Sequence, residues 1–312
     1  MEKFTIDILI PTYRPGTETA ELLRRLADQV YPVHQLLIVN TEEKYWNPEL
    51  EKAYPGCQVR HIRKEEFDHG GTRDWMARQS AADILLFMTQ DALPADNRLV
   101  SRLAAMFADP QVKAAYARQL PRKNCSLLES YTRRFNYPPE SAIKSREDLP
   151  ELGIKTFFCS NVCAAYERKT YMELGGFPER TVFNEDMIYA GHLIEAGYSI
   201  AYVAEAKVYH SHNYNGRQQF HRNFDLAVSQ AQHPELFEKY PSEGEGIRLV
   251  KETAKYVCKI GKPWLLFPLV WQSGCKYAGY WLGKRYEKLP GWMLKKCSMN
   301  RNFEKNDCQN TI

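Results

Sequence analysis

Two acidic motifs offer side chains that can act as metal ligands or as general bases. Gln90 and Asp91 lie just after an apolar run at residues 84–88, with Thr89 between them and the run. A carboxylate at the end of a strand can hold a divalent cation, because Mg²⁺ and Mn²⁺ prefer hard oxygen ligands and commonly bridge a diphosphate. The alternative is that Asp91 caps the segment after it, and the motif by itself does not decide between the two interpretations.

Glu185 and Asp186 form the second acidic motif, directly after Asn184 and at the start of a stretch with helical spacing. Two acids in the first turn of a helix are stabilised by the helix dipole, and this structural interpretation is favoured for the motif taken alone. The functional alternative is that one carboxylate faces a cleft as a general base, within hydrogen-bond reach of an incoming hydroxyl group.

Two histidines close an alternating run at residues 207–212. If this run is a strand, its period of two points His210 and His212 to the same side. Two imidazoles on one face can ligate a metal or hold phosphate oxygens. A core or surface role remains the structural alternative for the pair.

A glycine pair precedes a helical stretch in the segment 67–73, which reads FDHGGTR. Gly70 and Gly71 let the backbone approach a ligand, and a helix N-terminus favours phosphate. Arg73 would add a charge-assisted contact, with His69 beside it. A tight strand-to-helix turn is the alternative.

The elements that must position these residues alternate between strand and helix. Short apolar runs predict strands at 5–10, where Pro11 ends the run, and at 35–39, 59–62 and 84–88, with helices at 17–29 and 71–82 between them. This alternation predicts an α/β fold with a doubly wound sheet, whose ligands bind beyond the carboxyl ends of the strands. The polar residues expected at those ends are Pro11, Thr12, Tyr13, Asn40, Thr41, Glu42, Gln90 and Asp91.

The second half of the chain gives a less regular pattern. Residues 121–150 are rich in Pro, Arg, Lys and Ser and predict a loop or lid. A strand is expected at 156–166, a short helix at 169–174 ended by two glycines, and a helix at 185–197. Further strands are expected at 200–203 and 207–212.

Composition excludes several classes of protein. The 312 residues are 44% hydrophobic, 26% charged and 12% aromatic, which excludes a disordered, collagen-like or coiled-coil chain. We find no signal peptide pattern and no apolar stretch of about 18 residues, so a spanning helix is not expected. Eight cysteines without a CxxC pair indicate reduced thiols in a cytosolic protein.

The net charge of +4 is divided unevenly along the chain. Residues 246–312 carry 13 Lys and Arg against 4 Asp and Glu, which leaves residues 1–245 with a net charge of −5. Basic charge confined to one end argues against a nucleic-acid binder. Its mixture with aromatic residues suits helices lying in a lipid headgroup region, and a helical hairpin packed on the body or on a second subunit is the alternative. The aromatic residues are Trp264, Trp271, Tyr277, Tyr280, Trp281 and Trp292.

Taken together and in order, the motifs resemble the family-2 glycosyltransferases with the GT-A fold over residues 4–215. The segment IPTY at 10–13 is similar to the end of the first, nucleotide-binding strand of that family. The bacterial polysaccharide rhamnosyltransferase branch resembles this chain at FDHGGTRDWMA (67–77), MTQDALP (88–94), LGGFPE (174–179), NEDM (184–187) and VYHSHNY (208–214). The resemblance implies a GT-A, Rossmann-like mixed sheet flanked by helices, followed by a C-terminal amphipathic helical tail.

The resemblance also implies a role for each matched residue. Asp186 matches the catalytic base with Glu185 beside it, and Asp91 matches the last acid of the motif that holds Mg²⁺ or Mn²⁺, with His210 or His212 as further ligands. Ser160 and Asn161 fall at the acceptor side. The donor side comprises Pro11, Thr12, Tyr13, Asn40, Glu42, His69, Gly70, Arg73, Gln90 and Asp91.

Two segments depart from the family pattern. Residues 40–43 read NTEE where the family has an acidic, Ser-rich segment that contacts the nucleoside, and Thr89–Gln90 stand where a first metal-binding acid is usual. These departures leave two alternatives open beside an inverting transfer from dTDP-rhamnose. One is a UDP-sugar donor, and the other is a non-catalytic nucleotide-sugar-binding scaffold of a polysaccharide assembly complex.

The expected organisation is a glycosyltransferase domain at 1–215, a helical connector at 216–245 and a basic aromatic tail at 246–312 that binds a membrane surface. The resemblance implies a nucleotide-sugar donor and a lipid-linked glycan acceptor. It also implies a cytoplasmic protein, peripheral on the inner face of the plasma membrane, with no nucleic-acid partner and with a homodimer left open.

Overall fold

The computed structural model describes residues 4–300, which divide into two compact units. The first, called the sheet unit below, comprises residues up to 122 together with 137–179 and 185–211. The second, called the helical unit, comprises residues 123–136, 180–184 and 212 onward. Residues 301–312 of the expected membrane-binding tail lie outside the described residues.

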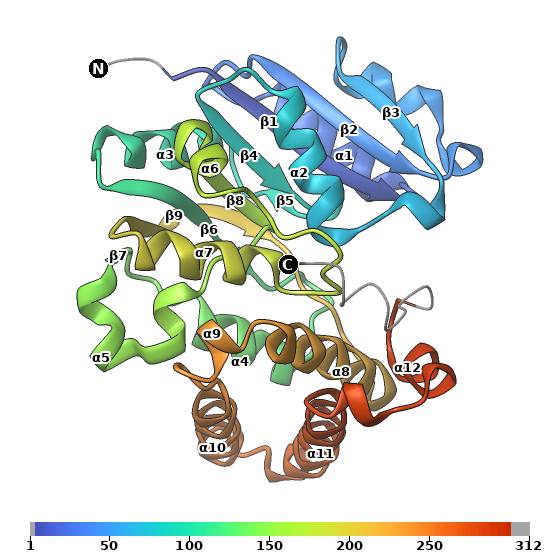
Figure 1. The fold of residues 1–312 in the computed structure, drawn as a ribbon, viewed down its shortest axis with the longest axis vertical. Coiled ribbons are helices and arrows are strands. Elements are labelled where there is room, and N and C mark those ends of the chain that lie inside the picture. Colours follow the sequence, from blue (N-terminus) through green and yellow to red (C-terminus); the bar gives the residue numbers. More distant parts are fainter. Residues whose placement is uncertain (1–3, 301–312) are drawn as a thin grey trace. The chain divides into compact units, whose positions relative to one another are not determined.

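A mixed sheet forms the centre of the sheet unit (Figure 1). Strands β3, β2, β1 and β4 run parallel, β8 is antiparallel to both β4 and β6, and β9 runs parallel to β6. In spatial order the strands are β3 (Gln58–Ile62), β2 (Gln35–Thr41), β1 (Ile6–Tyr13), β4 (Ile84–Met88), β8 (Cys163–Glu167), β6 (Val112–Leu120), β9 (Ser199–Tyr209) and β5 (Leu93–Pro94), and β7 (Ala142–Lys144) also pairs with β9.

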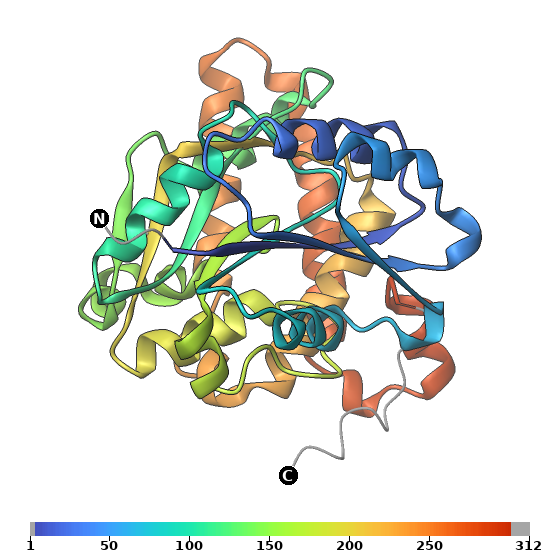
Figure 2. The same ribbon diagram turned by 90° about the horizontal axis from the view of Figure 1, so that it is seen from above.

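Helices cover both faces of this sheet, as the edge-on view in Figure 2 shows for α1 and α2. Every second residue of β1, such as Ile8, packs in one hydrophobic core with Leu22 and Leu23 of α1 (Thr17–Ala27) and with Leu99 of α3 (Leu99–Ala104). Successive side chains of a strand point to opposite faces of the sheet. Because helices cover both faces, β1 is buried along nearly its whole length.

The opposite face carries α2 (His69–Gln79), α6 (Arg168–Glu173) and α7 (Glu185–Glu195). Beneath them lies a cluster of buried aromatic rings in edge-to-face and tilted contacts, with neighbouring centroids 5.0–6.3 Å apart. Its members are Phe87, Tyr166, Tyr171, Phe177 and Tyr189. The cluster supports the start of α7, where the second acidic motif stands.

Two strand predictions were wrong in extent. The first strand does not stop at Pro11 but continues to Tyr13, because β4 pairs with β1 only as far as Leu9 and the missing N–H of Pro11 breaks no bond on that side. The strands expected at 200–203 and 207–212 are one strand, β9, whose register against β6 shifts between Val203 and Lys207. That irregularity absorbs the residues that interrupt the apolar pattern.

The predictions for residues 121–166 were also wrong in part. The expected loop at 121–150 contains helix α4 (Leu127–Asn136), strand β7 and the short helix α5 (Leu149–Leu152). The strand expected at 156–166 begins only at Cys163, and residues 153–157 form a 3₁₀ turn. The other predicted elements are confirmed, with shifts at their ends. They are the remaining strands and the helices expected at 17–29, 71–82, 169–174 and 185–197.

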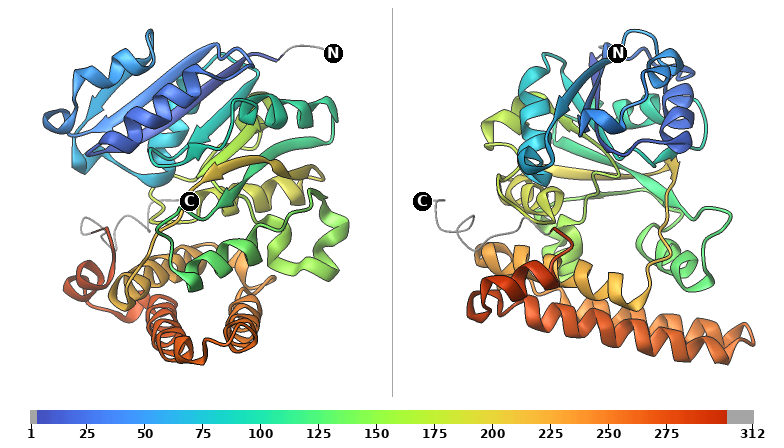
Figure 3. Two further views of the ribbon diagram at one scale, coloured as in Figure 1. Left: turned by 180° about the vertical axis from the view of Figure 1, so that it is seen from behind. Right: turned by 90° about the vertical axis from the view of Figure 1, so that its right-hand side faces the viewer.

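The helical unit consists of α4 and of five helices from the last third of the chain (Figure 3). They are α8 (Gly216–Gln232), α9 (Pro234–Phe237), α10 (Glu243–Lys259), α11 (Leu266–Gly283) and α12 (Gly291–Cys297). Two glycines let α11 lie directly on the backbone of α8: a Cβ at Gly279 would stand 2.2 Å from the Phe220 carbonyl oxygen, and one at Gly283 would stand 2.4 Å from that of Phe224.

One side of α11 is exposed and aromatic. Phe267, Trp271 and Tyr277 have exposed fractions of 81%, 64% and 69%. The amphipathic tail is therefore helical where the structure describes it. Among residues 4–300, we find no helix of the length and apolar character needed to cross a membrane.

Candidate active site at the strand ends

Hydrogen bonds join the carboxyl ends of β1, β2 and β4, as the doubly wound pattern predicts. The Tyr13 amide donates to Gln90 Oε1 at 2.9 Å, and Gln90 Nε2 donates back to the Tyr13 carbonyl oxygen at 3.0 Å. Thr12 Oγ1 donates to Asn40 Oδ1 at 3.1 Å. Four residues predicted from strand ends on the donor side therefore form one connected rim.

Glu42 closes β2 in an unusual conformation, with φ at +68°. This left-handed backbone costs free energy for a residue other than glycine, and such strain is concentrated at functional sites. The Glu42 carboxylate accepts the Lys64 amide at 2.9 Å and lies 2.6 Å from Lys44 Nζ. The hydrogen bond from Lys44, followed by that from Lys64, lowers the pKa of Glu42, so the carboxylate stays ionised.

An aromatic and cationic surface beside Glu42 was missed by the sequence analysis. Arg14 also has a positive φ, and its guanidinium lies 4.5 Å from the centre of the Tyr45 ring. The Tyr13 and Tyr45 rings meet edge to face with centroids 5.8 Å apart. Such flat side chains offer stacking area to a planar ligand.

Asp91 and His210 approach each other in the sheet unit, with His210 Nε2 3.5 Å from Asp91 Oδ2. The other ring nitrogen, Nδ1, lies 3.0 Å from Gln119 Oε1. Because that oxygen only accepts hydrogen bonds, Nδ1 carries the proton and the lone pair of Nε2 in the neutral ring faces Asp91. A metal-binding histidine is usually held in this manner by a partner on its second nitrogen.

The strand that was expected to carry both histidines is shorter than predicted, because β9 ends at Tyr209. His210, the first residue after the strand, is buried beside Gln119. His212 is the first residue of the last segment of the helical unit, and its ring stacks on that of Tyr214 with centroids 5.1 Å apart. His212 as a metal ligand therefore stays a prediction from its spacing to His210.

Two residues around this pair had no recognisable sequence signal. Gln119 Nε2 also donates to the Tyr137 hydroxyl at 2.5 Å and to Ser160 Oγ at 3.0 Å, so it links His210 to the predicted acceptor residue. The guanidinium of Arg122 donates to the Asp91 carbonyl oxygen and lies 4.0 Å from Asp91 Oδ2. Both sets of contacts join residues far apart in the chain, which sequence spacing does not reveal.

The second acidic motif stands where α7 begins, and Asn161 holds both of its carboxylates. The Asn161 amide donates to Asp186 Oδ2 at 2.9 Å, and Asn161 Nδ2 donates to Glu185 Oε1 at 3.2 Å. Tyr166 fixes this amide side chain by donating to Asn161 Oδ1 at 2.9 Å. Just before the helix, Asn184 has a φ of +71°, a further left-handed position beside a candidate site.

Arg73 gives Glu185 a buried partner. Arg73 Nη1 lies 3.2 Å from Glu185 Oε1 and donates to the His69 carbonyl oxygen at 2.8 Å, and both side chains of the ion pair are buried. The structure thus brings three predicted donor-side or catalytic residues together, although Arg73 contacts a carboxylate. At the start of α2, Asp68 Oδ2 accepts the Gly71 amide at 2.5 Å, so phosphate binding at Gly70 stays a prediction.

The two neighbouring carboxyl groups have opposite pKa shifts. Burial alone would raise the pKa of Glu185, but the charges of Arg73 and His69 and the hydrogen bond from Asn161 outweigh it and lower this pKa. Burial raises the pKa of Asp186 to about 7, and the negative charge of Glu185 adds to the rise. A partly exposed carboxyl group with a pKa near neutrality can act as a general base, whereas Glu185 is held ionised.

A buried lysine supports the turn that leads to Ser160 and Asn161. Lys144 Nζ donates to the carbonyl oxygens of Lys155 and Phe158 and lies 5.0 Å from the centre of the Tyr116 ring. Burial lowers the pKa of Lys144 to about 7. No motif or spacing in the polar segment 121–150 singled out this residue.

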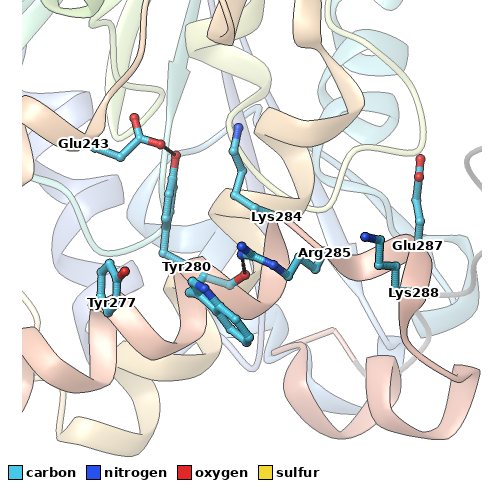
Figure 4. A pocket seen from close by; sticks show the side chains of 8 residues that line it. Glu243, Tyr277, Tyr280, Lys284, Arg285, Glu287 and Lys288 are labelled. Atoms are coloured by element: carbon cyan, nitrogen blue, oxygen red, sulfur yellow. Dashed lines mark hydrogen bonds between the residues drawn. The ribbon is translucent and has the colours of Figure 1, made fainter.

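A second candidate binding surface lies at the C-terminal end of α11 in the helical unit, shown in Figure 4. It is a hollow of about 490 Å³ whose lining includes Tyr277, Lys284 and Lys288. Arg285 lies over the Trp281 ring, 4.1 Å from its centre, and donates to the Trp281 carbonyl oxygen at 2.9 Å. The surface combines exposed rings with cations, as the basic aromatic composition of residues 246–312 predicted.

Three comparisons with known proteins agree with this geometry. The family model described as Glycosyl transferase family 2 matches residues 7–175. The O-antigen chain rhamnosyltransferase RfbN of Salmonella typhimurium is 37% identical over 303 residues, 96% of either chain, and WbaN of Salmonella anatum is 37% identical over 309 residues, 98% of this chain and 97% of its own. A mannosyltransferase from Pyrobaculum calidifontis, solved with GDP-Man and Mn²⁺, shares the fold with a TM-score of 0.55 at 16% identity over 98% of this chain and 83% of its own.

Proposed function

The chain belongs to glycosyl transferase family 2, and on that basis we propose that it transfers rhamnose from dTDP-rhamnose to a lipid-linked glycan, with inversion at the anomeric carbon. The two Salmonella relatives, which are similar over nearly the whole chain, are named O-antigen chain rhamnosyltransferases. Their names support rhamnose as the sugar and a cell-surface polysaccharide as the product. The dTDP nucleotide rests on the resemblance of the motifs.

The observation that carries the proposal is the environment of Asp186. Its two oxygens accept the amides of Asn161 and Met187, at 2.9 and 2.8 Å, and each keeps a second lone pair for a substrate. Its raised pKa suits a group that must accept a proton near neutral pH. A protein that only binds nucleotide sugars has no need of such a base, which argues against the scaffold alternative.

In the proposed reaction Asp186 removes the proton of an acceptor hydroxyl as its oxygen attacks the anomeric carbon. The new carbon–oxygen bond forms on the face opposite the bond that breaks, and the electron pair of the broken bond leaves with the nucleoside diphosphate. Asn161 orients Asp186 for this step, while Arg73 and Asn161 keep Glu185 fixed and ionised behind it. Pre-set geometry of this kind lowers the barrier by positioning.

We further propose that Asp91 and His210 hold a divalent cation, Mg²⁺ or Mn²⁺, with His212 as a third ligand two residues along the chain. The fit is supported by the Nε2 lone pair that faces Asp91 and by the hydrogen bond from Nδ1 to Gln119. When bound, such a cation would offset the negative charge that develops on the leaving diphosphate. The presence of Mn²⁺ in the mannosyltransferase of the same fold supports this assignment.

The exposed face of α11 supports the proposal of a membrane-bound acceptor on the inner face of the plasma membrane. Phe267, Trp271 and Tyr277 are exposed along α11, and Lys284, Arg285 and Lys288 follow at the end of the helix. Aromatic rings at the headgroup level and cations near anionic lipid are the usual components of an interfacial helix. This arrangement favours a membrane surface over a packed hairpin.

The function is tested by measuring release of nucleoside diphosphate from a panel of dTDP- and UDP-sugars, with membrane lipid extract as the acceptor source. We expect turnover with dTDP-rhamnose that requires Mg²⁺ or Mn²⁺ and ceases in EDTA. Turnover with a UDP-sugar would keep the fold and the base but reject the donor. Absence of turnover with every donor, together with calorimetric binding of dTDP, would contradict the acceptor proposal.

A further inference from the structure

A cavity of about 180 Å³ inside the helical unit is separate from the residues assigned above to the base. It lies between α4, α8, α10 and α11, which the two views of Figure 3 show side by side, and the segment 212–215 completes its wall. One part of the lining is apolar and includes Leu128, Leu249 and Leu269. The other part is polar and includes Gln219, Gln272 and Lys276.

Lys276 is out of place on the face of α11 that packs against other helices. Its neighbours along the helix, Gln272 and Ser273, line the same cavity, whereas Phe267, Trp271 and Tyr277 point to solvent. Within residues 4–300, no hydrogen bond or ion pair joins Lys276 to another residue. Lys276 is half-buried, and an ammonium group that is partly removed from water without a partner is held unfavourably until an anion reaches it.

The charged groups around Lys276 do not neutralise it. Glu129 of α4 is the only acid that acts on it among the described residues, and Arg133 already binds Glu129 at 2.6 Å. Arg133 and Arg222 add positive charge, and burial lowers the pKa of Lys276. Glu129 and Lys276 both line the cavity, and Arg133 and Arg222 lie behind its wall, so the surroundings of the cavity carry an excess of positive charge that an anionic group would balance.

The remaining polar lining fits a carbohydrate. The carboxamides of Gln219 and Gln272 and the hydroxyl of Ser273 can each donate and accept hydrogen bonds, as the hydroxyls of a sugar ring require. The leucines on the opposite side offer an apolar wall for the C–H face of such a ring. One cation, several amides and hydroxyls, and an apolar wall match a ligand that is both a sugar and a phosphate.

We propose that this cavity binds a sugar phosphate, with the phosphate against the Lys276 ammonium and the ring against the apolar wall. The inference rests on the proposed function in one respect: a glycan joined to a lipid through phosphate would present this group as part of the acceptor. The helical unit then recognises the phosphate-linked sugar of the acceptor through residues other than the base.

The test is calorimetric titration of the full chain in EDTA, which removes metal-bound phosphate, with glucose 1-phosphate, inorganic phosphate and glucose as probes. We expect binding of glucose 1-phosphate that weakens at least tenfold in Lys276→Gln, weaker binding of inorganic phosphate and none of glucose. Lys251→Gln removes the same charge from the exposed side of α10 and should leave the affinity unchanged. Lys276→Met serves as a second variant, and thermal unfolding confirms that each variant folds.

Equal affinity of the wild type and both Lys276 variants for glucose 1-phosphate would overturn the proposal. Equal affinity for inorganic phosphate and for glucose 1-phosphate would overturn the sugar part and leave free phosphate as the ligand. The Asp186→Asn variant separates this inference from the proposed function, because it should retain glucose 1-phosphate binding while losing transfer. Loss of binding in that variant would contradict a separate site.

Discussion

The sheet unit and the helical unit differ in how particular charged side chains are partnered. In the sheet unit, Glu185 lies between Arg73 and Asn161, and Lys144 donates to two backbone carbonyls. In the helical unit, Lys276 has no such partner among residues 4–300, and several large aromatic rings face solvent. The first unit holds these charged groups in place by its own contacts, whereas the second presents surfaces that a ligand or a membrane would complete.

This difference fits the two tasks of the proposed enzyme. A reacting site benefits from groups that are fixed before the substrate arrives, because reorganisation during the reaction adds to the barrier. A recognition surface can leave part of its hydrogen bonding and charge to the ligand, and affinity then depends on that ligand. Substitutions in the sheet unit should therefore affect chemistry and stability, and those on the helical surfaces should affect binding.

The largest effect is expected from replacing the proposed base. Asp186→Asn keeps the size of the side chain and its contact with the Asn161 amide but cannot accept the proton of an acceptor hydroxyl. We expect transfer to fall by about 10²–10⁴-fold, the usual contribution of a general base, with donor affinity within about twofold of wild type. Turnover in the presence of acceptor extract and calorimetry with dTDP measure the two quantities. Near wild-type transfer would reject Asp186 as the base.

The next effect concerns stability and comes from the buried ion pair. Arg73→Met leaves the Glu185 carboxylate buried without its cation, and removing one partner of such a pair destabilises a protein by about 3–5 kcal/mol. Chemical denaturation gives the free energy of unfolding. The double variant with Glu185→Gln should recover much of this loss, since no uncompensated charge remains. A loss below about 1 kcal/mol in Arg73→Met would mean that Glu185 does not depend on this partner.

Local sequence patterns predicted the ends of β4 and the start of α7, and hence the places of Asp91 and Asp186. Each of these positions follows from a run of neighbouring residues with one periodicity. They did not predict Gln119, Lys144 or Arg122, because their contacts join distant segments: Gln119 meets His210, 91 positions further along the chain. The polar segment around α4 was likewise predicted to be a loop. Its helix packs against α10, which lies far along the chain: the rings of Tyr131 and Tyr256 stack with centroids 4.5 Å apart.

A smaller loss of stability should follow from a methyl group between α11 and α8. In Gly283→Ala the new Cβ would lie 2.4 Å from the Phe224 carbonyl oxygen and 2.8 Å from the Ala227 Cβ, so the helices must separate. Overpacking of this kind destabilises by about 1–3 kcal/mol. Gly274→Ala on the exposed face of the same helix meets no atom within 4 Å and should stabilise by up to about 1 kcal/mol through helix propensity. Equal melting temperatures for the two variants would contradict the close packing.

The pH dependence of transfer reports the base within the sheet unit. Because the pKa of Asp186 is raised to about 7, transfer should fall roughly tenfold for each pH unit below that value, while Glu185, with its lowered pKa, stays ionised. The raised pKa also means that the folded protein holds a proton on Asp186 up to about pH 7, where the unfolded chain has already lost it. Its contribution to stability is complete below the ordinary value of 3.8 and is lost as pH rises through about 7.

Asp186→Asn provides the control for this pH profile. The variant should lose that part of the pH dependence of its melting temperature, and the comparison with wild type is necessary because Lys144 also has a pKa lowered to about 7. A wild-type rate that stays constant from pH 8 to pH 5 would show that the proton acceptor is not a group with a raised pKa.

The smallest effect on the fold, and a selective one on binding, should come from the exposed rings of α11. In the double variant Phe267→Ser and Tyr277→Ser the free energy of unfolding should change by no more than about 0.5 kcal/mol per site, because neither ring is buried. Affinity for vesicles containing anionic lipid should nevertheless fall by about 1 kcal/mol, roughly fivefold, for each ring half buried among headgroups. Val30→Ser removes an exposed apolar side chain from the sheet unit and should change neither quantity. Equal sedimentation of the wild type and both variants with vesicles would mean that the aromatic face binds a partner other than lipid. The contrast between the two units would then rest on the cavity at Lys276 alone.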